Sequence, residues 1–272
     1  MRRPSHSAWL VRWGLHLTEA LARRRKIIDL MPSMFMPRRR LIYDRRTGRL
    51  RRFHMRNDNS DYRAYDQNIA RTALDLSRFP QNARLQQCYQ AMVADGKTPI
   101  VIDCGANIGT STYWLATEFP LARILAVKPD AENARYAELN TSVCGNVRVI
   151  QGAISAADGK VDLDQAERGA DSYRTVVSEN GTIPAYSIAG LLRQEDATGE
   201  QLLLVKIDIE GFEENLFAQN TDWVADASVI IVEPHDWMLP GRAASRHLLR
   251  AISSGDRDFL VDGEHVLSFQ NA

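Results

Sequence analysis

The sequence contains few cysteines and no long apolar run. Its 272 residues include Cys88, Cys104 and Cys144, none of them part of a CxxC pair, which argues against a disulfide framework or a structural zinc site. No run of 18 or more apolar residues is present, which argues against a transmembrane helix. With 44% apolar and 25% charged residues, the chain is typical of a globular protein. We therefore expect a protein of a reducing, cytoplasmic compartment.

The sequence also lacks net charge, but its charges are unevenly distributed. Residues 1–63 contain 17 basic and 5 acidic residues, whereas residues 64–272 contain 17 basic and 29 acidic ones. The positive excess of the first segment indicates an anionic partner, such as a phosphorylated carrier or the surface of a membrane at its inner face. Because net charge does not determine a fold, this asymmetry concerns partners alone.

Two elements are predicted within a basic N-terminal extension of residues 1–60, which precedes a main domain of residues 61–272. Residues 7–30 carry apolar side chains at helical spacing among basic ones, which predicts an amphipathic helix. That helix would lie on an anionic membrane, or pack on its own domain or on a second copy in a homodimer. The layout of a signal peptide is absent. Residues 37–56 read as a hairpin that turns near Gly48, and its arginines would contact phosphate groups or form a solvated strand face.

In the main domain, short apolar strands alternate with helices. Fully apolar strands separated by helices predict an α/β fold with a mostly parallel sheet that is covered on both faces. Ligands bind such sheets beyond the carboxyl ends of the strands. Strands are expected over 99–103, 123–127, 146–150, 201–208, 227–232, 258–261 and 265–269. Helices are expected through residues 113–115, over about 130–142 and near 241–253.

A glycine-containing loop follows the first of these strands. In VIDCGANIGTS (residues 101–111), Gly105 and Gly109 follow Asp103 and open a helix. Glycine permits a tight turn and a close ligand, and the helix N-terminus offers free N–H groups. The loop has neither the lysine of a phosphate-binding P-loop nor the GxGxxG spacing of dinucleotide-binding folds. Its spacing is similar to that of class I S-adenosylmethionine methyltransferases, and a purely structural turn is the alternative.

Several blocks together resemble the FkbM-type methyltransferases, over about residues 55–235. They are MRNDNSDYRAYDQNI (55–69), DCGANIGTST (103–112), AVKPDAENARYAELN (126–140), VIQGAIS (149–155), VKIDIEGFEENLF (205–217) and VIIVEPHDW (229–237). The resemblance implies a class I methyltransferase fold, Rossmann-like, with a mostly parallel seven-stranded sheet. It also implies transfer of a methyl group from S-adenosylmethionine to a hydroxyl of a sugar, a glycan or a natural product.

The same resemblance implies the residues of the site. One carboxylate of the 208–210 segment, or His235, would accept the proton of the acceptor hydroxyl. A structural ion pair of Lys206 with Asp208 or Glu210 is the alternative, and no metal is expected although oxygen ligands are present. The implied cofactor residues are Asp103, Gly105, Asn107, Gly109, Lys128, Asp130, Gly152 and Ala153, the catalytic ones are Asp208, Glu210 and His235, and Glu213 and Glu233 would also surround the acceptor.

Lys128 departs from the family, which has an acidic residue at this position. A carboxylate accepts hydrogen bonds from both ribose hydroxyls, whereas an ammonium group only donates. The loss would cost about 1.5–3 kcal/mol, or roughly 10- to 150-fold in cofactor affinity. One alternative is therefore a methyltransferase-fold interaction module that binds cofactor weakly or not at all. RNA 2′-O-methylation is another, but the acidic main domain and the lack of an aromatic RNA-binding motif argue against a nucleic-acid partner.

Overall fold

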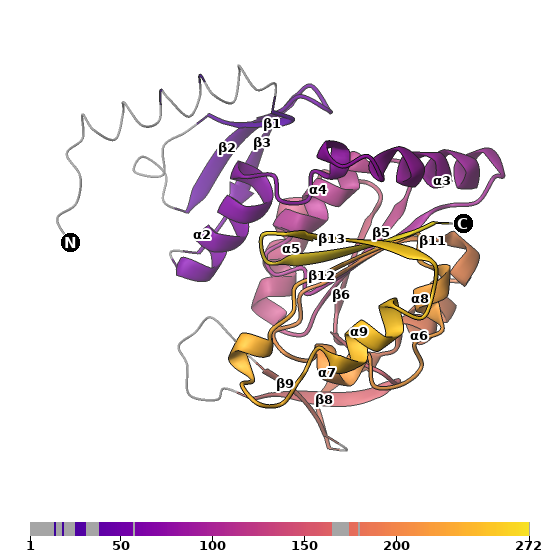
Figure 1. Cartoon of the computed structure of the whole chain (residues 1–272). Helices are drawn as coiled ribbons and strands as arrows, with labels where there is room; N and C mark the ends of the chain where they lie inside the picture. Colours follow the sequence, from indigo (N-terminus) through magenta and orange to yellow (C-terminus); the bar gives the residue numbers. More distant parts are fainter. Residues whose placement is uncertain are drawn as a thin grey trace. The chain divides into compact units, whose positions relative to one another are not determined.

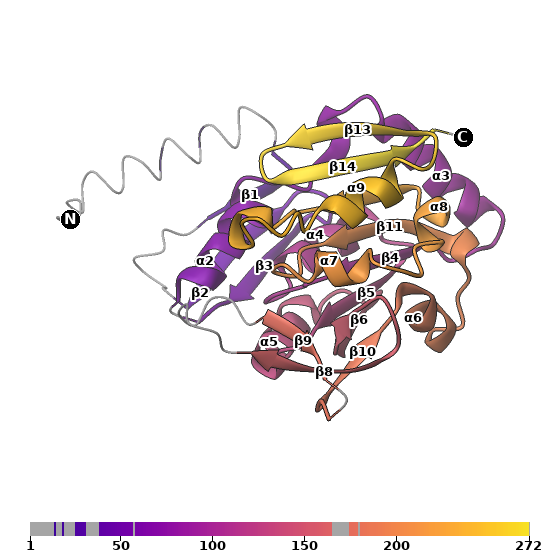
Figure 2. The ribbon, with the colours of Figure 1, turned by 60° about the horizontal axis from the view of Figure 1, so that its bottom comes forward.

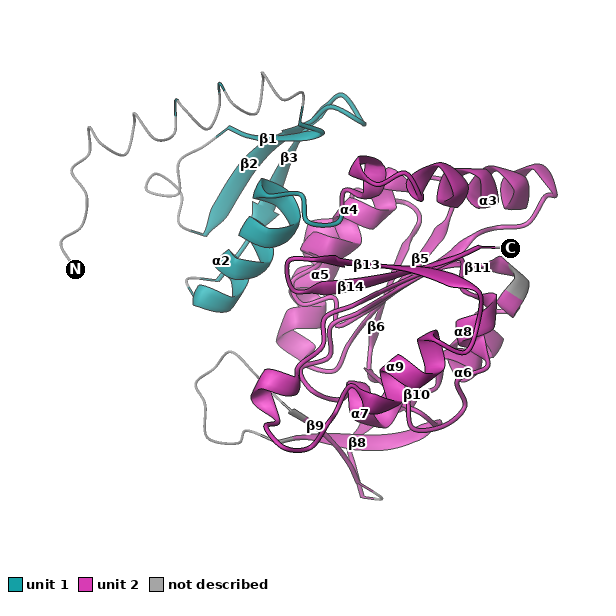
Figure 3. Ribbon diagram, viewed as in Figure 1, with its two compact units in different colours: residues 1–74 teal, residues 75–272 magenta. Residues whose placement is uncertain are grey.

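The chain divides into two compact units, residues 1–74 and residues 75–272 (Figure 3). The predicted boundary at residue 60 falls inside helix α2 (Asn59–Tyr65) of the first unit. No helix among the described residues is long and apolar enough to cross a bilayer. The computed structural model describes residues 14, 18, 25–30, 38–56, 58–164, 174–178 and 180–271.

The first unit contains a three-stranded antiparallel sheet, β1 (Ile27–Asp29), β2 (Arg39–Asp44) and β3 (Arg49–His54). Strands β2 and β3 confirm the predicted hairpin. Most of the predicted amphipathic helix lies outside the described residues, but its last part was wrong, because residues 27–29 form a strand. Here pairing with β2 and burial of the strand override the helical spacing. The π-helix η1 (Asp66–Ala70) follows α2.

A seven-stranded sheet forms the centre of the second unit, in the order β13-β14-β12-β11-β4-β5-β6 (Figure 2). Strand β14 is antiparallel to both neighbours, and the other pairs are parallel, which confirms the predicted mostly parallel sheet. Strands β4, β11 and β12 are buried throughout because helices cover both faces. The strands are β4 (Ile100–Cys104), β5 (Arg123–Lys128), β6 (Val147–Gln151), β11 (Leu202–Ile207), β12 (Val229–Val232), β13 (Arg257–Asp262) and β14 (His265–Gln270).

Helices cover the two faces of this sheet as separate groups (Figure 1). On one face lie α3 (Asn82–Ala94), α4 (Thr110–Glu118) and α5 (Ala131–Thr141). The other face packs Leu191, Trp223 and Leu248 into one apolar core with the strands. This second group comprises α6 (Ile188–Gln194), α7 (Glu213–Leu216), α8 (Trp223–Asp226) and α9 (Arg246–Ile252). The described residues also form short 3-10 helices, η2 (Leu76–Arg78), η3 (Gly199–Gln201) and η4 (Asp236–Met238).

A second, smaller sheet that the sequence analysis did not predict follows β6. Its strands, in the order β7-β10-β8-β9, are β7 (Ala153–Ile154), β10 (Ile183–Tyr186), β8 (Gly159–Asp164) and β9 (Arg174–Val177). It begins at Gly152, where a Cβ atom would lie 2.7 Å from the ring of Tyr186. The sheet therefore starts beside the carboxyl ends of the main strands, where ligands of such folds bind.

Candidate active site

Asp103, near the end of β4, links this strand to the first turn of α4, on the other side of the glycine-containing loop. One carboxylate oxygen accepts hydrogen bonds from the hydroxyls of Ser111 and Thr112, both at 2.7 Å. The other lies 3.3 Å from Lys206 Nζ. Asp103 is fully buried, so it shapes the loop and does not itself line the cleft described below.

Two glycines allow this loop to pass close to its neighbours. Gly105 has φ +88°, and a Cβ atom there would lie 1.7 Å from the carbonyl oxygen of Asp208. Gly109 has φ +84°, and its Cβ would lie 2.8 Å from Ala137 Cα. Asn107, between them, also has a positive φ of 48°, a conformation that asparagine tolerates better than most residues. The loop sequence therefore sets how closely β4 and α4 approach β11 and α5.

A cleft lies at the carboxyl ends of β4, β5 and β11. Four of the eight predicted cofactor residues line it, together with Asp208 and Glu210, whereas Asp103, Asn107, Gly109 and Asp130 are not in its lining. Asp130 instead caps helix α5, because its Oδ1 accepts a hydrogen bond from Asn133 N at 2.8 Å. The lining consists of Gly105, Val127, Lys128, Pro129, Gly152, Ala153, Ile154, Thr175, Asp208, Ile209, Glu210 and Phe212.

The sequence analysis did not predict two residues of this lining, Thr175 and Phe212. Thr175 belongs to β9 of the small sheet, and Phe212 follows the turn after β11. No local pattern near Thr175 links it to a strand end more than 40 residues earlier. The signal for Phe212 was present, since it stands beside Gly211 in a block that was already singled out.

Lys128 is half-buried at the end of β5 and faces an acidic part of the cleft. Burial lowers the pKa of its ammonium group, and the negative charges of Glu210, Asp208 and Asp130 oppose that shift. The side chain therefore sits among carboxylates at the position predicted to face the ribose.

Lys206 forms the structural ion pair that the sequence offered as an alternative. Its Nζ lies 3.3 Å from Asp208 Oδ2 and 3.2 Å from the carbonyl oxygen of Gly105. Burial disfavours the charge of Lys206, but Asp103 and Asp208 outweigh this effect and raise its pKa. Glu210 is not part of this ion pair. Strand β11 ends at Ile207, and Glu210 has a φ of 55°, which turns the chain away from the strand.

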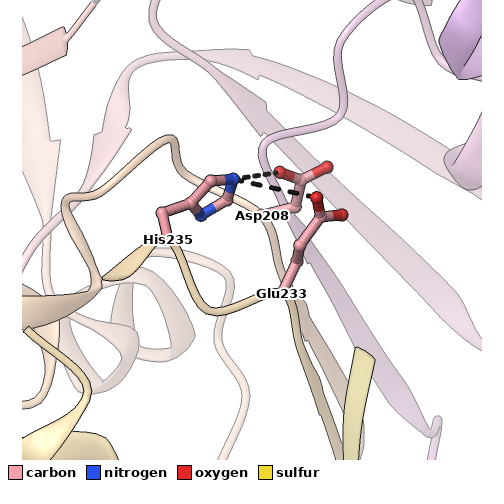
Figure 4. Close-up of side chains that lie close together, drawn as sticks. All are labelled: Asp208, Glu233 and His235. Atoms are coloured by element: carbon pink, nitrogen blue, oxygen red, sulfur yellow. Dashed lines mark ion pairs between the residues drawn. The ribbon is translucent and has the colours of Figure 1, made fainter. Parts of the chain in front are cut away.

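His235 lies at the centre of an acidic cluster beyond the ends of β11 and β12 (Figure 4). Its Nδ1 is 3.0 Å from Glu213 Oε1, which also accepts hydrogen bonds from the backbone N–H groups of Ile209 and Gly211. Its Nε2 faces three further carboxylates, at 3.8 Å from Asp208, 3.8 Å from Glu233 and 3.9 Å from Glu210. Glu213 is 2% exposed and orients the imidazole through its contact with Nδ1. The sequence analysis had instead placed Glu213 beside the acceptor.

The cluster shifts the pKa values of its members in different directions. Burial opposes protonation of His235, but the hydrogen bond and charge of Glu213 and the charges of Asp208 and Glu210 raise its pKa to about 9. Burial, followed by the charge of Asp208, raises the pKa of Glu233 to about 7 and also raises the pKa of Glu210. Burial would raise the pKa of Asp208, but Lys206 outweighs it and lowers that pKa. Groups that titrate near neutrality at a cleft are typical of catalytic sites.

An open groove adjoins the cleft and shares Thr175, Glu210 and Phe212 with it. Its other walls come from β9, the segment around α7 and the approach to α9, including Arg242 and His247. Glu210 thus lies in the lining of both hollows, beside His235. A second molecule placed in the groove would meet a cofactor in the cleft at this carboxylate.

Comparison with known proteins identifies the family. Residues 103–261 match the methyltransferase FkbM domain. No curated protein matches the sequence of the chain.

Solved structures with a similar arrangement are distant in sequence. A putative O-methyltransferase from Klebsiella pneumoniae is 17% identical, with 79% of this chain and 91% of that chain covered and a TM-score of 0.39. Magnesium protoporphyrin IX methyltransferase from Synechocystis PCC 6803, with bound S-adenosylmethionine, is 13% identical over 70% and 79% of the two chains, with a TM-score of 0.36. The family match spans more than half of this chain and contains both the loop after β4 and the acidic cluster. The chain therefore belongs to the FkbM family and is an S-adenosylmethionine-dependent methyltransferase.

Proposed function

We propose that this methyltransferase transfers its methyl group to a hydroxyl of a sugar, a glycan or a small natural product, and so forms an O-methyl ether. The observation that carries the proposal is the position of Glu210, which lines both the cofactor cleft and the adjoining groove and lies 3.9 Å from His235 Nε2. A hydroxyl is a weak nucleophile unless its proton is removed, and groups that accept protons lie at this junction.

The cofactor would occupy the cleft between the Gly105 loop and Gly152. S-adenosylmethionine supplies an electrophilic methyl group when it is bound. The chain's own contribution is to position the acceptor for in-line approach and to take up its proton at Glu210 or Asp208. His235, whose pKa of about 9 keeps it protonated at neutral pH, would place a positive charge beside these carboxylates. Glu213 supports this step by fixing the orientation of the imidazole. Asp208 is held in turn by Lys206, so the junction is preorganised on both sides.

Two measurements test the proposal. S-adenosylhomocysteine should bind the full chain in calorimetry, and S-adenosylmethionine with a labelled methyl group should yield an O-methyl sugar in hydrolysates of glycan or nucleotide-sugar fractions. Asp208→Asn should reduce transfer at least about 100-fold, whereas Glu264→Gln, an exposed carboxylate outside the junction, should not. Label recovered as an N-methyl product would contradict the proposal.

The interaction-module alternative is favoured by one observation: Lys128, at the position that the sequence predicts to face the ribose, lines the cleft. It predicts that wild-type protein does not bind S-adenosylhomocysteine, even though it is folded. Saturable binding in the micromolar range would remove this alternative. Transfer of label to RNA instead of glycan would point to 2′-O-methylation.

The basic extension supports a further proposal about the partner, namely that it contacts the phosphate groups of a carrier or of a membrane surface. Arg39, opposite His54 in the β2–β3 pairing, and Arg52 are exposed. Arg39 pairs with His54 across the two strands, and Arg52 lies two residues before His54 on β3, so the three side chains share one face of the hairpin. Substituting both arginines by glutamate should weaken co-sedimentation with anionic vesicles, whereas Arg84→Glu in the second unit should not. Equal sedimentation of both variants would contradict the proposal.

A further inference from the structure

Three side chains of the acidic cluster point their polar atoms at one place (Figure 4). Asp208 Oδ1 and Glu233 Oε1 each lie 3.8 Å from His235 Nε2, and suitable atoms of all three residues lie within 4.8 Å of one another. The residues come from the ends of the adjacent parallel strands β11 and β12. Because those strands are buried and paired, the three side chains start from a fixed backbone.

The imidazole of His235 turns its Nε2 toward this place. Glu213 Oε1 accepts two backbone hydrogen bonds in addition to its contact with Nδ1, so it acts as a carboxylate and Nδ1 carries the hydrogen. Nε2 is then the nitrogen that a cation would bind in place of its proton, and among the described residues no group lies within hydrogen-bond distance of it. His235 is only 3% exposed. A buried imidazole whose other N–H is held by a carboxylate is the arrangement of metal-binding histidines.

Asp208 and Glu233 each direct one carboxylate oxygen toward His235 and the other away from it. Asp208 directs Oδ2 to Lys206 at 3.3 Å and leaves Oδ1 toward His235. Glu233 has Oε2 at 3.8 Å from His265 Nε2 and Oε1 toward His235. One oxygen of Asp208 is thus held by Lys206, and the second oxygen of each carboxylate lies on the side of His235.

The spacing suits a small divalent cation. Two ligand atoms about 2.1 Å from one ion lie roughly 3.0 Å apart at a right angle and about 3.4 Å apart at a tetrahedral angle. The observed 3.8 Å separations exceed these values by less than 1 Å, which rotation of the two carboxylates can close. The surrounding charge also fits, because Asp208, Glu210, Glu213 and Glu233 outnumber the nearby ammonium groups of Lys206 and Lys128.

We propose that Asp208 Oδ1, Glu233 Oε1 and His235 Nε2 form a divalent-cation site, whose remaining coordination positions water or the acceptor would fill. Two carboxylates and one imidazole are a donor set suited to Mn²⁺, since Mg²⁺ prefers oxygen ligands alone. Cation binding does not depend on the proposed acceptor. The consequence for catalysis does rest on the proposed function: a bound cation would lower the pKa of an acceptor hydroxyl, and Glu210 would remain available to receive its proton.

The site is tested by titrating the chelator-treated protein with Mn²⁺. Binding is measured as the decrease of the electron paramagnetic resonance signal of free Mn²⁺. We expect one saturable site per chain. Glu233→Gln and His235→Asn should each weaken Mn²⁺ binding at least about 10-fold. The matched control Glu264→Gln removes a nearby exposed carboxylate whose charge reaches Glu233, and it should leave the affinity within about threefold.

A second measurement does not depend on whether the variants fold. Electron spin-echo modulation of Mn²⁺ bound to the wild-type protein should show coupling to an imidazole nitrogen. Absence of saturable binding, binding without nitrogen coupling, or an equal effect of Glu264→Gln would each overturn the proposal. Calorimetry with S-adenosylhomocysteine, which needs neither cation nor acceptor, reports separately on the cofactor cleft, so failure of the cation site and failure of the proposed function are distinguishable.

Discussion

Lys206 is the residue whose replacement should most clearly reveal how this site is held together. The residue is 3% exposed, and its Nζ lies 3.3 Å from carboxylate oxygens of both Asp103 and Asp208. Lys206→Met keeps most of the length of the side chain and removes the charge. It leaves two carboxylates at the ends of adjacent strands without their shared partner. Breaking a buried ion pair by removing one member costs about 3–5 kcal/mol. The hydroxyls of Ser111 and Thr112 still hold Asp103, so we expect no more than this range.

The assay is thermal unfolding followed by circular dichroism at pH 7. For a chain of this size, a loss of 3–5 kcal/mol corresponds to a fall in Tm of roughly 6–20 °C. The difference between wild type and variant should depend on pH. Lys206 lowers the pKa of Asp208 in the folded protein, so its stabilising effect is fully present above the unfolded-state pKa of about 3.9. The difference should therefore be complete at pH 7 and shrink as the pH falls through the folded-state pKa.

The matched control is Lys160→Met, which removes an exposed lysine and should change stability by less than about 0.5 kcal/mol. A fall in Tm for Lys206→Met no larger than that of the control would refute the reasoning. So would a difference between wild type and variant that grows on acidification, because it would mean that the ammonium group repels its surroundings.

Three further predictions concern the cleft and the fold. Lys128→Glu should tighten S-adenosylhomocysteine binding about 10- to 150-fold in calorimetry, because a carboxylate can accept both ribose hydroxyls; weaker binding would mean that Lys128 itself contacts the cofactor. Gly105→Ala should abolish S-adenosylhomocysteine binding, because the added Cβ meets the carbonyl oxygen of Asp208. The control is Gly96→Ala, since Gly96 also has a positive φ but no atom lies within 4 Å of the added Cβ. This control should lower the stability by only about 1–2 kcal/mol. Arg257→Met should destabilise the protein by about 2–4 kcal/mol in chemical unfolding, since the guanidinium donates to the carbonyls of Val224, Ala227 and Ser268; a change below 1 kcal/mol would show that these carbonyls find other donors.

The sequence by itself determined the main sheet and the loop beneath the cleft. The apolar runs that became β4, β5, β11 and β12 lie where the residues predicted them, because a strand buried on both faces is apolar along most of its length. The two glycines of the 103–112 loop were readable for a similar reason: only glycine meets the steric demand of a close approach at positive φ. Asp130 shows a limit of the same reasoning, since its carboxylate caps α5 although its position resembled a cofactor contact.

The tertiary structure decided which polar groups face one another. Glu213 and His235 are 22 residues apart, and only the adjacent ends of β11 and β12 bring them within 3.0 Å. The same packing commits Asp103 to Ser111 and Thr112 and brings Thr175 of the small sheet into the cleft. Local sequence fixes strand and turn propensity through sterics and apolar spacing. The partner of a buried charge depends on which strands pair and which side chains lose their water, and both are settled only when the chain has folded.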